Sequence, residues 1–376
     1  MPKYGAAKNE AFQELTVQYR HGYLSIPCLL GGVGIGKTEM AEALSVEAGE
    51  KLIDDCMVFE PIPTGEASDP TDTSGIPWVI TVDGEPTKSE YRVLWALNRA
   101  AWDACHHPCL LLFDDIDKAT PIVVNSLLHL FVHRRFKDFT LHPKTLMMCA
   151  GNRTTDDVSA NALSESIRTR VTPIEVEADF KDFSQWALDV PDGQPAKVHP
   201  TLLGFLNYKP DLLHKHDEKM LRFPTPRGYR ETSLHMYEFP ETKGWHRLVE
   251  RKLGKHVAAD FWSWFTILSK IDVDHLLDHG TLKSPISAEK GTPVEVAQRM
   301  AEFASVFALT ERLNQKIRDD HNGLPKFIDN LSPELQVAFL LQLREPTKRD
   351  FRNFYKNAAG KIMGNIIKDS QAGASP

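Results

Sequence analysis

The sequence predicts an α/β fold, in which a parallel sheet is covered by helices, followed by an all-helical region. Two observations lead to this prediction. Up to about residue 180, short apolar runs of strand length alternate with segments of helical periodicity, and this alternation is typical of parallel sheets. Beyond that point the strand signal stops, and apolar residues recur only at helical spacing.

The composition indicates a globular protein with more than one domain. The chain has 376 residues, of which 42% are hydrophobic and 25% charged. A formal net charge of −7 argues against a general affinity for nucleic acid or anionic membranes. The N-terminus shows no signal-peptide pattern, and no run is apolar and long enough for a membrane span, so we expect a cytoplasmic protein.

The first elements frame a glycine-rich turn. A helix is predicted over 8–22, a strand over about 25–31 and a second helix from Gly36 to about Ala48. The turn between the last two fits G-x-x-x-x-G-K-[ST]; its residues are Gly31, Gly32, Val33, Gly34, Ile35, Gly36, Lys37 and Thr38. Backbone N–H groups of such a turn bind a polyphosphate, and the helix N-terminus adds its dipole. We expect Lys37 to reach the β and γ phosphates and Thr38 to bind Mg²⁺.

The next segment is harder to interpret. A second strand is predicted over 51–59, and a hairpin-like segment over 78–91 is centred on Val82-Asp83-Gly84. The spacing of apolar residues from 88 to 105 predicts a helix, whose two tryptophans we interpret as core residues. The run from Cys105 to Cys109 contains metal-binding side chains but lacks a second ligand pair at zinc spacing, and a helix end that meets a buried strand explains it better.

Two adjacent carboxylates follow the apolar run 109–113. That run predicts a buried strand, and Asp114 and Asp115 lie at its carboxyl end, where parallel α/β sheets bind ligands. Asp114 is suited to positioning a metal ion, and Asp115 to activating water. The alternative is a strand that simply runs into a polar turn.

A further strand end carries an amide. A helix is predicted over 121–134, a short hairpin over 134–141 and a buried strand over 145–150, after which comes Asn152. An amide can both donate and accept, so Asn152 could hold an attacking water; a loop-capping Asn is the alternative. A last strand over 172–176 completes the predicted sheet.

Three arginines are candidates for phosphate contacts. Arg168 and Arg170 precede the last strand, at the edge of the domain, where one of them could reach the nucleotide of a neighbouring subunit; either could equally be a solvated surface residue. Arg227 follows the helix-start pair Thr225-Pro226, where the helix dipole disfavours a cation unless an anion lies nearby. A salt bridge from Arg227 to Glu231 is the alternative.

Together these motifs resemble the AAA+ ATPases, specifically the MoxR-like branch. The resemblance covers about residues 20–240. It rests on the motifs above, in their order, and on three further stretches: Asp69 to Pro77, Asp114-Asp-Ile-Asp-Lys-Ala119, and Phe223-Pro-Thr-Pro-Arg227. The resemblance makes 31–38 the Walker A motif, Asp114 and Asp115 Walker B, and Asn152 sensor 1. It also makes Arg170 the arginine finger, with Arg168 as its rival, and Arg227 sensor 2.

The resemblance also implies an architecture and a partner. The expected sheet order is 5-1-4-3-2, within a nucleotide-binding core over 1–180. A helical lid over 181–250 and a helical, partner-specific region over 251–376 are expected to follow. Such proteins bind and hydrolyse ATP with Mg²⁺ as rings of about six subunits and remodel partner proteins like chaperones. Many work with a von Willebrand factor A-type protein.

One residue departs from the family pattern, and two other functions stay open. Walker B usually ends in Asp-Glu, whereas here the second acid is Asp115, which is one methylene shorter, so hydrolysis is expected to be slow unless Asp117 contributes. A DNA-directed AAA+ motor or loader is one alternative, which the acidic balance of the chain disfavours. A nucleotide-binding switch with little turnover is the other.

Overall fold

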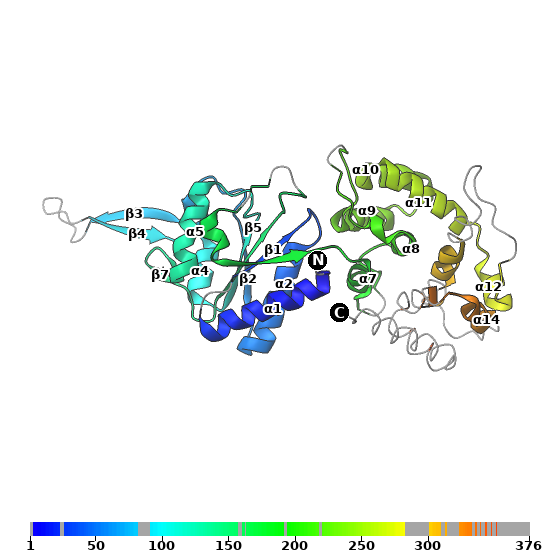
Figure 1. Cartoon of the computed structure of the whole chain (residues 1–376), viewed down its shortest axis with the longest axis horizontal. Helices are drawn as coiled ribbons and strands as arrows, with labels where there is room; N and C mark the ends of the chain where they lie inside the picture. The colour runs from blue at the N-terminus through cyan, green and yellow to red at the C-terminus, as the bar shows by residue number, and fades with distance from the viewer. Residues whose placement is uncertain are drawn as a thin grey trace. The chain divides into compact units, whose positions relative to one another are not determined.

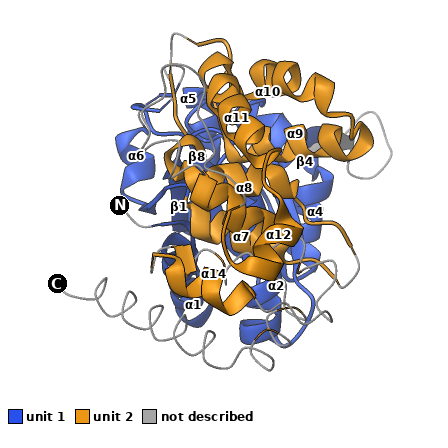
Figure 2. Ribbon diagram, turned by 90° about the vertical axis from the view of Figure 1, so that its right-hand side faces the viewer, with its two compact units in different colours: residues 1–178 blue, residues 179–376 orange. Residues whose placement is uncertain are grey.

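The computed structural model describes residues 3–22, 26–81, 91–156, 160–161, 163–191, 194–217, 220–282, 301–309 and 323–332, and a few single residues up to Phe351. The chain divides into two compact units, 1–178 and 179–376 (Figure 2). Strands occur in the first unit, whereas the described elements of the second are all helical (Figure 1).

The first unit is built on a five-stranded sheet in which every neighbouring pair is parallel. Its strands are β1 (Ile26–Gly31), β2 (Val58–Pro63), β5 (Cys109–Asp114), β8 (Leu146–Gly151) and β9 (Val171–Val176). They lie in the order β2-β5-β8-β1-β9. Numbered by their place in the chain and read from β9, this is 5-1-4-3-2, so the sheet order expected of an AAA+ core is confirmed.

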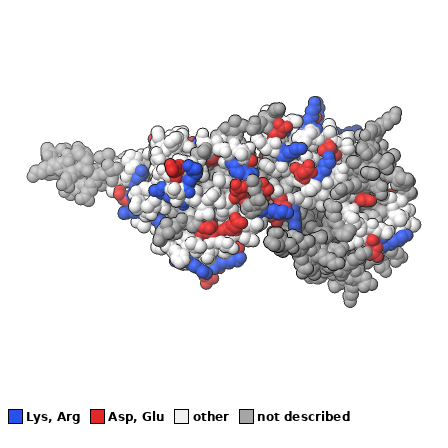
Figure 3. All heavy atoms as spheres, in the orientation of Figure 1, with Lys and Arg blue, Asp and Glu red and all other residues white. Residues whose placement is uncertain are grey.

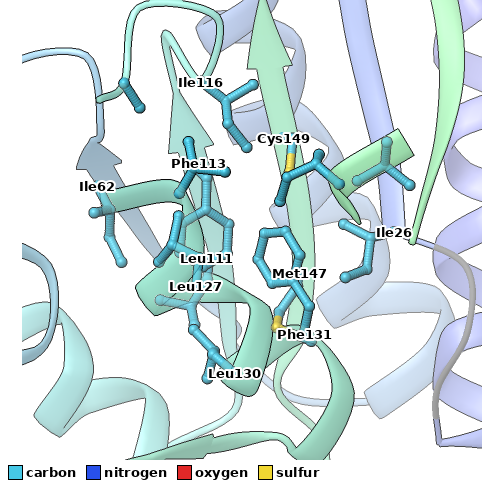
Figure 4. Close-up of a cluster of buried hydrophobic side chains, with 14 of the residues drawn as sticks. Ile26, Ile62, Leu111, Phe113, Ile116, Leu127, Leu130, Phe131, Met147 and Cys149 are labelled. Carbon is cyan, nitrogen blue, oxygen red and sulfur yellow. The ribbon is translucent and has the colours of Figure 1, made fainter. Parts of the chain in front are cut away.

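Helices cover both faces of this sheet and bury alternate side chains of its strands. They are α1 (Tyr4–His21) and α2 (Lys37–Ala48) on one face, and α4 (Arg99–His106) and α5 (Pro121–His133) on the other. In β5, Leu110 and Leu112 pack in the core beneath α1 and α2. Leu111 and Phe113 pack in the core beneath α4 and α5 (Figure 4). Both faces of a central strand are therefore apolar, which explains its continuous hydrophobic sequence.

The prediction of a strand over 51–59 is wrong except for its last two residues, with which β2 begins. Helix α2 is instead extended by a π-helical turn, η1 (Gly49–Ile53), which ends at Asp54 with φ 57°. The strand β2 begins only at Val58 and contains Pro61 and Pro63. Proline lacks the N–H group that donates hydrogen bonds to a neighbouring strand. Because β2 lies at the edge of the sheet and has only one neighbouring strand, it can contain prolines.

The prediction of a helix over 88–105 is wrong in its first half. Strand β4 (Tyr91–Ala96) pairs antiparallel with β3 (Ile76–Thr81), and this two-stranded ribbon extends away from the central sheet (Figure 1). Helix α4 starts later, because the Asn98 side chain accepts a hydrogen bond from the N–H of Ala101 at 2.8 Å. The expected turn at 82–84 lies outside the described residues.

The two tryptophans of that segment are not core residues. Trp95 of the ribbon is half-buried, and Trp102 of α4 is 48% exposed. The Trp102 ring stacks on His106, with ring centroids 4.1 Å apart. The short hairpin expected over 134–141 is confirmed as β6 (Arg135–Phe136) paired with β7 (Phe139–Thr140).

Every regular element that the structure describes in the second unit is a helix, as predicted. Its helices are α7 (Phe180–Leu188), α8 (Pro200–Tyr208), α9 (Pro226–Glu238), α10 (Trp245–Leu253), α11 (Lys255–Leu268), α12 (Val273–His279) and α14 (Gly323–Asn330). The expected cap of α9 is confirmed, since the Thr225 hydroxyl accepts from the N–H of Gly228 at 3.0 Å. Among the described helices of either unit, none has the length and hydropathy that crossing a membrane requires.

Candidate functional site

The glycine-rich turn connects the carboxyl end of β1 to the first turn of α2. Gly36, the residue before the helix, has φ 94°, a conformation that favours glycine. Gly31 lies so close to the neighbouring strand that an added Cβ would stand 2.4 Å from the carbonyl oxygen of Val176. Glycine at both positions therefore allows the loop to turn tightly between two packed elements.

Lys37 holds this loop together from inside. The side chain is buried, and its ammonium group donates hydrogen bonds to the carbonyl oxygens of Gly31 at 2.9 Å and Gly32 at 3.0 Å. A third bond goes to Oδ1 of Asn152, at 2.9 Å, from the end of a different strand. The three N–H groups of the ammonium thus each have an acceptor.

The charge of Lys37 is set by two opposing effects. Burial lowers the pKa of its ammonium from 10.5 to about 8, while the nearby carboxylates of Asp114, Asp115 and Asp117 act in the opposite direction. Since a pKa of about 8 still lies above neutral pH, most Lys37 side chains carry a charge there. The site therefore combines a buried cation with three acidic groups.

The side chains of Thr38 and Asp114 meet beside this lysine. The Thr38 hydroxyl donates to Oδ2 of Asp114 at 2.8 Å. Adjacent oxygen ligands of an octahedral Mg²⁺ ion, each at 2.0–2.1 Å from the metal, are about 2.9 Å apart. The two oxygens therefore fit a Mg²⁺ site that keeps its other positions for water and phosphate.

Asp115 takes a different position from its neighbour. Its backbone is left-handed, with φ 50°, and its N–H donates to Oδ1 of Asp114 at 3.0 Å. The carboxylate is about half exposed, 3.9 Å from the ammonium of Lys118. It is thus accessible to water, as an activating group requires.

Asn152 follows β8 and lies between two charged side chains. It is 5% exposed and accepts from Lys37, while its backbone N–H donates to Oδ1 of Asp117 at 2.9 Å and its amide Nδ2 to Oδ2 of the same carboxylate at 3.3 Å. The structure therefore brings Lys37, Thr38, Asp114 and Asn152 together at the carboxyl ends of β1, β5 and β8.

Arg168 and Arg170 do not join this group. They lie at helix α6 (Glu165–Arg168) and just before β9, whose first residue pairs with the first residue of β1. The glycine-rich turn begins at the last residue of β1, five positions after the first, so the arginines are roughly 16 Å away from it along the strands. Arg168 is exposed; Arg170 donates to the Ser166 carbonyl at 2.6 Å.

Arg227 belongs to the second unit. It is exposed in the first turn of α9. The carboxylate of Glu231, its alternative partner, forms an ion pair with Lys252 instead, at 3.1 Å. A sensor role for Arg227 stays a prediction.

The cysteine-histidine run over 105–109 spans the end of α4 and the start of β5. Cys105 lies in the last turn of α4 and Cys109 is the first residue of β5, which agrees with the interpretation of a helix end that meets a buried strand. Within the part of the chain that the structure describes, no three His, Cys, Asp or Glu side chains are grouped so that they could hold a metal ion.

Sequence reasoning missed two residues that support the site. The hydroxyl of Tyr4, at the start of α1, donates to the Gly36 carbonyl at 3.2 Å. Thr64, just after β2, donates to the carbonyl of Asp114 through its hydroxyl at 2.5 Å and its N–H at 3.0 Å. Neither contact has a local sequence signal, because the partners are 32 and 50 positions apart.

Comparisons with known proteins find only distant structural similarities. No protein-family model matches the chain, and neither does any curated protein sequence. Among solved structures, it is similar to the RuvB Holliday junction branch migration motor of Thermotoga maritima, with 11% identity and a TM-score of 0.32, over 91% of this chain and 85% of that one. A DNA polymerase III gamma subunit-related protein of the same organism has 12% identity and a TM-score of 0.29, with 89% and 82% covered.

Proposed function

We propose that this protein is an ATPase that binds ATP with Mg²⁺ and hydrolyses it. The observation that carries the proposal is the convergence of Lys37, Thr38, Asp114 and Asn152 at one edge of a sheet with the order 5-1-4-3-2. Lys37 would contact the β and γ phosphates, and Thr38 and Asp114 would hold Mg²⁺, which neutralises charge on the phosphates. Asp115 would activate the water that Asn152 orients.

We further propose that the active form is a ring, in which an arginine of one subunit reaches the nucleotide of its neighbour. In the transition state, the negative charge on the transferred phosphoryl group is stabilised by a positively charged side chain beside it. Arg168 and Arg170 lie too far from the phosphate loop of their own subunit to supply it, whereas an edge strand can present them to a neighbour. Arg227 would contribute from a lid over 181–250, and a region over 251–376 would be partner-specific.

The partner we propose is a protein, in line with the MoxR-like branch. One face of the β3–β4 ribbon presents Ile76, Trp78 and Leu94, which are 62%, 66% and 51% exposed. Trp78 and Leu94 are directly paired across the two strands. Exposed apolar residues grouped in this way are typical of surfaces that bind proteins. The client would be remodelled in a chaperone-like reaction, with a von Willebrand factor A-type protein as a candidate partner.

The proposal is tested by measuring phosphate release from ATP in the presence of Mg²⁺, with Lys37→Ala as the control. We expect turnover by the wild-type chain that rises with protein concentration as subunits assemble, and none by Lys37→Ala. A wild-type chain that binds ATP but releases no phosphate at any concentration would support the nucleotide switch instead.

A DNA-directed motor is the second candidate. On the face drawn in Figure 3, basic and acidic side chains are interspersed rather than gathered into a basic stripe, and the net charge is −7. Adding duplex and single-stranded DNA to the same assay distinguishes the two functions. Stimulation by DNA that disappears with rising salt would favour the motor.

A further inference from the structure

Asp117 is a buried acid that the proposed reaction does not use. It lies three residues after Asp114, and its side chain is 1% exposed. Both carboxylate oxygens accept hydrogen bonds from Asn152: Oδ1 from the backbone N–H at 2.9 Å and Oδ2 from the side-chain amide at 3.3 Å. A carboxylate enclosed in this way cannot act as a base that activates water, which is the role in hydrolysis that the sequence analysis considered for Asp117.

The contacts of Asn152 allow only one orientation of its amide. On one side lies a carboxylate, which can only accept, and on the other the Lys37 ammonium, which can only donate. With Nδ2 toward Asp117 and Oδ1 toward Lys37, both neighbours are satisfied. In the flipped amide, an NH₂ group would face the ammonium and an oxygen would face the carboxylate, so both contacts would be repulsive.

The backbone is adapted to this contact. A Cβ on Gly151, the residue before Asn152, would stand 2.8 Å from Oδ1 of Asp117, so only glycine lets the carboxylate come this close. A line of hydrogen bonds thus runs from a buried anion through a neutral amide to a buried cation. Such a network is stabilising when every member is paired and costly when one is not.

We propose that Asp117 is a positioning residue of the phosphate site: it fixes the amide of Asn152 so that the carbonyl oxygen, and not the NH₂ group, faces Lys37. This inference rests on the proposed ATP site. It assigns Asp117 no contact with nucleotide or water. Asp117 acts on binding by positioning Asn152, in addition to its direct electrostatic effect on Lys37, and the positioning is testable by exchange of the two side chains.

The experiment compares Asp117→Asn, Asn152→Asp and the double exchange in full-length protein, by titration with a fluorescent ATP analogue and Mg²⁺. In Asp117→Asn, the new NH₂ group faces the NH₂ group of Asn152. In Asn152→Asp, the new carboxylate faces the carboxylate of Asp117. We expect each single change to weaken binding about tenfold or more. The double exchange conserves net charge and restores one donor and one acceptor between the two positions, so its loss of affinity should be clearly smaller than the product of the two single losses. It should still bind more weakly than the wild type, because a carboxylate at position 152 would hold the Lys37 ammonium more strongly than the amide oxygen does.

The outcomes separate the inference from the proposed function. If the two losses multiply in the double exchange, the side chains act independently and the inference is wrong. If a single variant fails to fold, circular dichroism of the double exchange decides, because recovery of the fold supports the coupling and failure contradicts it. A wild-type chain that binds no nucleotide would contradict the proposed function, whereas the inference fails when the wild type binds and the exchange restores nothing.

Discussion

The hydroxyl of Thr38 donates to Oδ2 of Asp114 at 2.8 Å, which joins the first turn of α2 to the end of β5 across 76 positions of sequence. These two oxygens belong to different elements, and both are needed for the proposed Mg²⁺ site. The phosphate loop and the acidic strand end are therefore parts of one site rather than two neighbouring motifs.

Removing the Thr38 hydroxyl should weaken the metal site. We expect Thr38→Ala to raise the Mg²⁺ concentration for half-maximal hydrolysis about tenfold or more, because one protein ligand is lost. Thr38→Ser keeps the hydroxyl and should stay close to wild type. Phosphate release measured over a Mg²⁺ titration provides the test; equal Mg²⁺ requirements for the Ala and Ser variants would remove Thr38 from the site.

Lengthening Asp115 should speed hydrolysis. The carboxylate is accessible, but it is one methylene shorter than the glutamate expected there, and a displacement of about 1 Å in a catalytic group can cost up to about 10²-fold in rate. We expect Asp115→Glu to raise the turnover number and Asp115→Ala to lower it about 10²-fold or more, with nucleotide affinity unchanged in both. Wild-type turnover by Asp115→Ala in a phosphate-release assay would show that another group activates water.

A finger arginine should be separable from the nucleotide site of its own subunit. Arg170→Ala should bind ATP normally, but its rate of hydrolysis should fall about 10³-fold. Lys37→Ala should also be inactive, for a different reason: it should not bind ATP. Mixing these two inactive variants should restore activity, because a Lys37→Ala subunit can supply Arg170 to its neighbour.

Arg168→Ala is the matched comparison in the same mixing experiment. If Arg168→Ala alone shows loss and complementation, Arg168 is the finger. If neither variant is restored by mixing, the arginines do not act between subunits.

Much of the sheet could be predicted, because its inner strands have buried residues on both faces. The apolar runs at β1, β5 and β8 are continuous; a glycine-rich turn follows the first, and polar residues follow the other two. Carboxyl ends of parallel strands meet at one edge, so a phosphate loop, two carboxylates and an amide at three such ends predict a shared site.

The mistaken elements are those whose local pattern competes with tertiary packing. β2 carries prolines that only an edge strand tolerates, and the spacing of Tyr91, Leu94 and Trp95 in β4 fits a helix as well as a strand. The pairing of β4 with β3 decides between the two. The support of the site by Asp117 was equally hidden, since its partner Asn152 is 35 positions away.

The second unit should lose stability on mild acidification through His199. Burial lowers the pKa of this imidazole to about 4 from 6.5, and the ring caps α8 by accepting from the N–H of Thr201 at 3.2 Å. Between pH 6.5 and 4 the unfolded chain binds the proton and the folded chain does not, so stability falls as pH falls. From pH 7 to pH 5 we expect a loss of about 2 kcal/mol from this group.

His199→Asn is the control, because asparagine caps a helix without titrating. The measurement is the free energy of urea unfolding at pH 7 and pH 5. The wild type should lose about 2 kcal/mol more than the variant between these two values. Equal losses would mean that His199 is protonated in the folded protein.

The arrangement around Lys37 has a consequence for affinity. An ammonium group has three N–H bonds, and here they are engaged by Gly31, Gly32 and Asn152. Under the proposed function, a phosphate oxygen could bind this ammonium only by displacing one of these three acceptors, so nucleotide binding at Lys37 would be a competition between acceptors. The free energy gained on binding would be the difference between two interaction energies of the ammonium, one with the charged phosphate oxygen and one with the neutral oxygen that it replaces. This difference is smaller than the energy of a new ion pair.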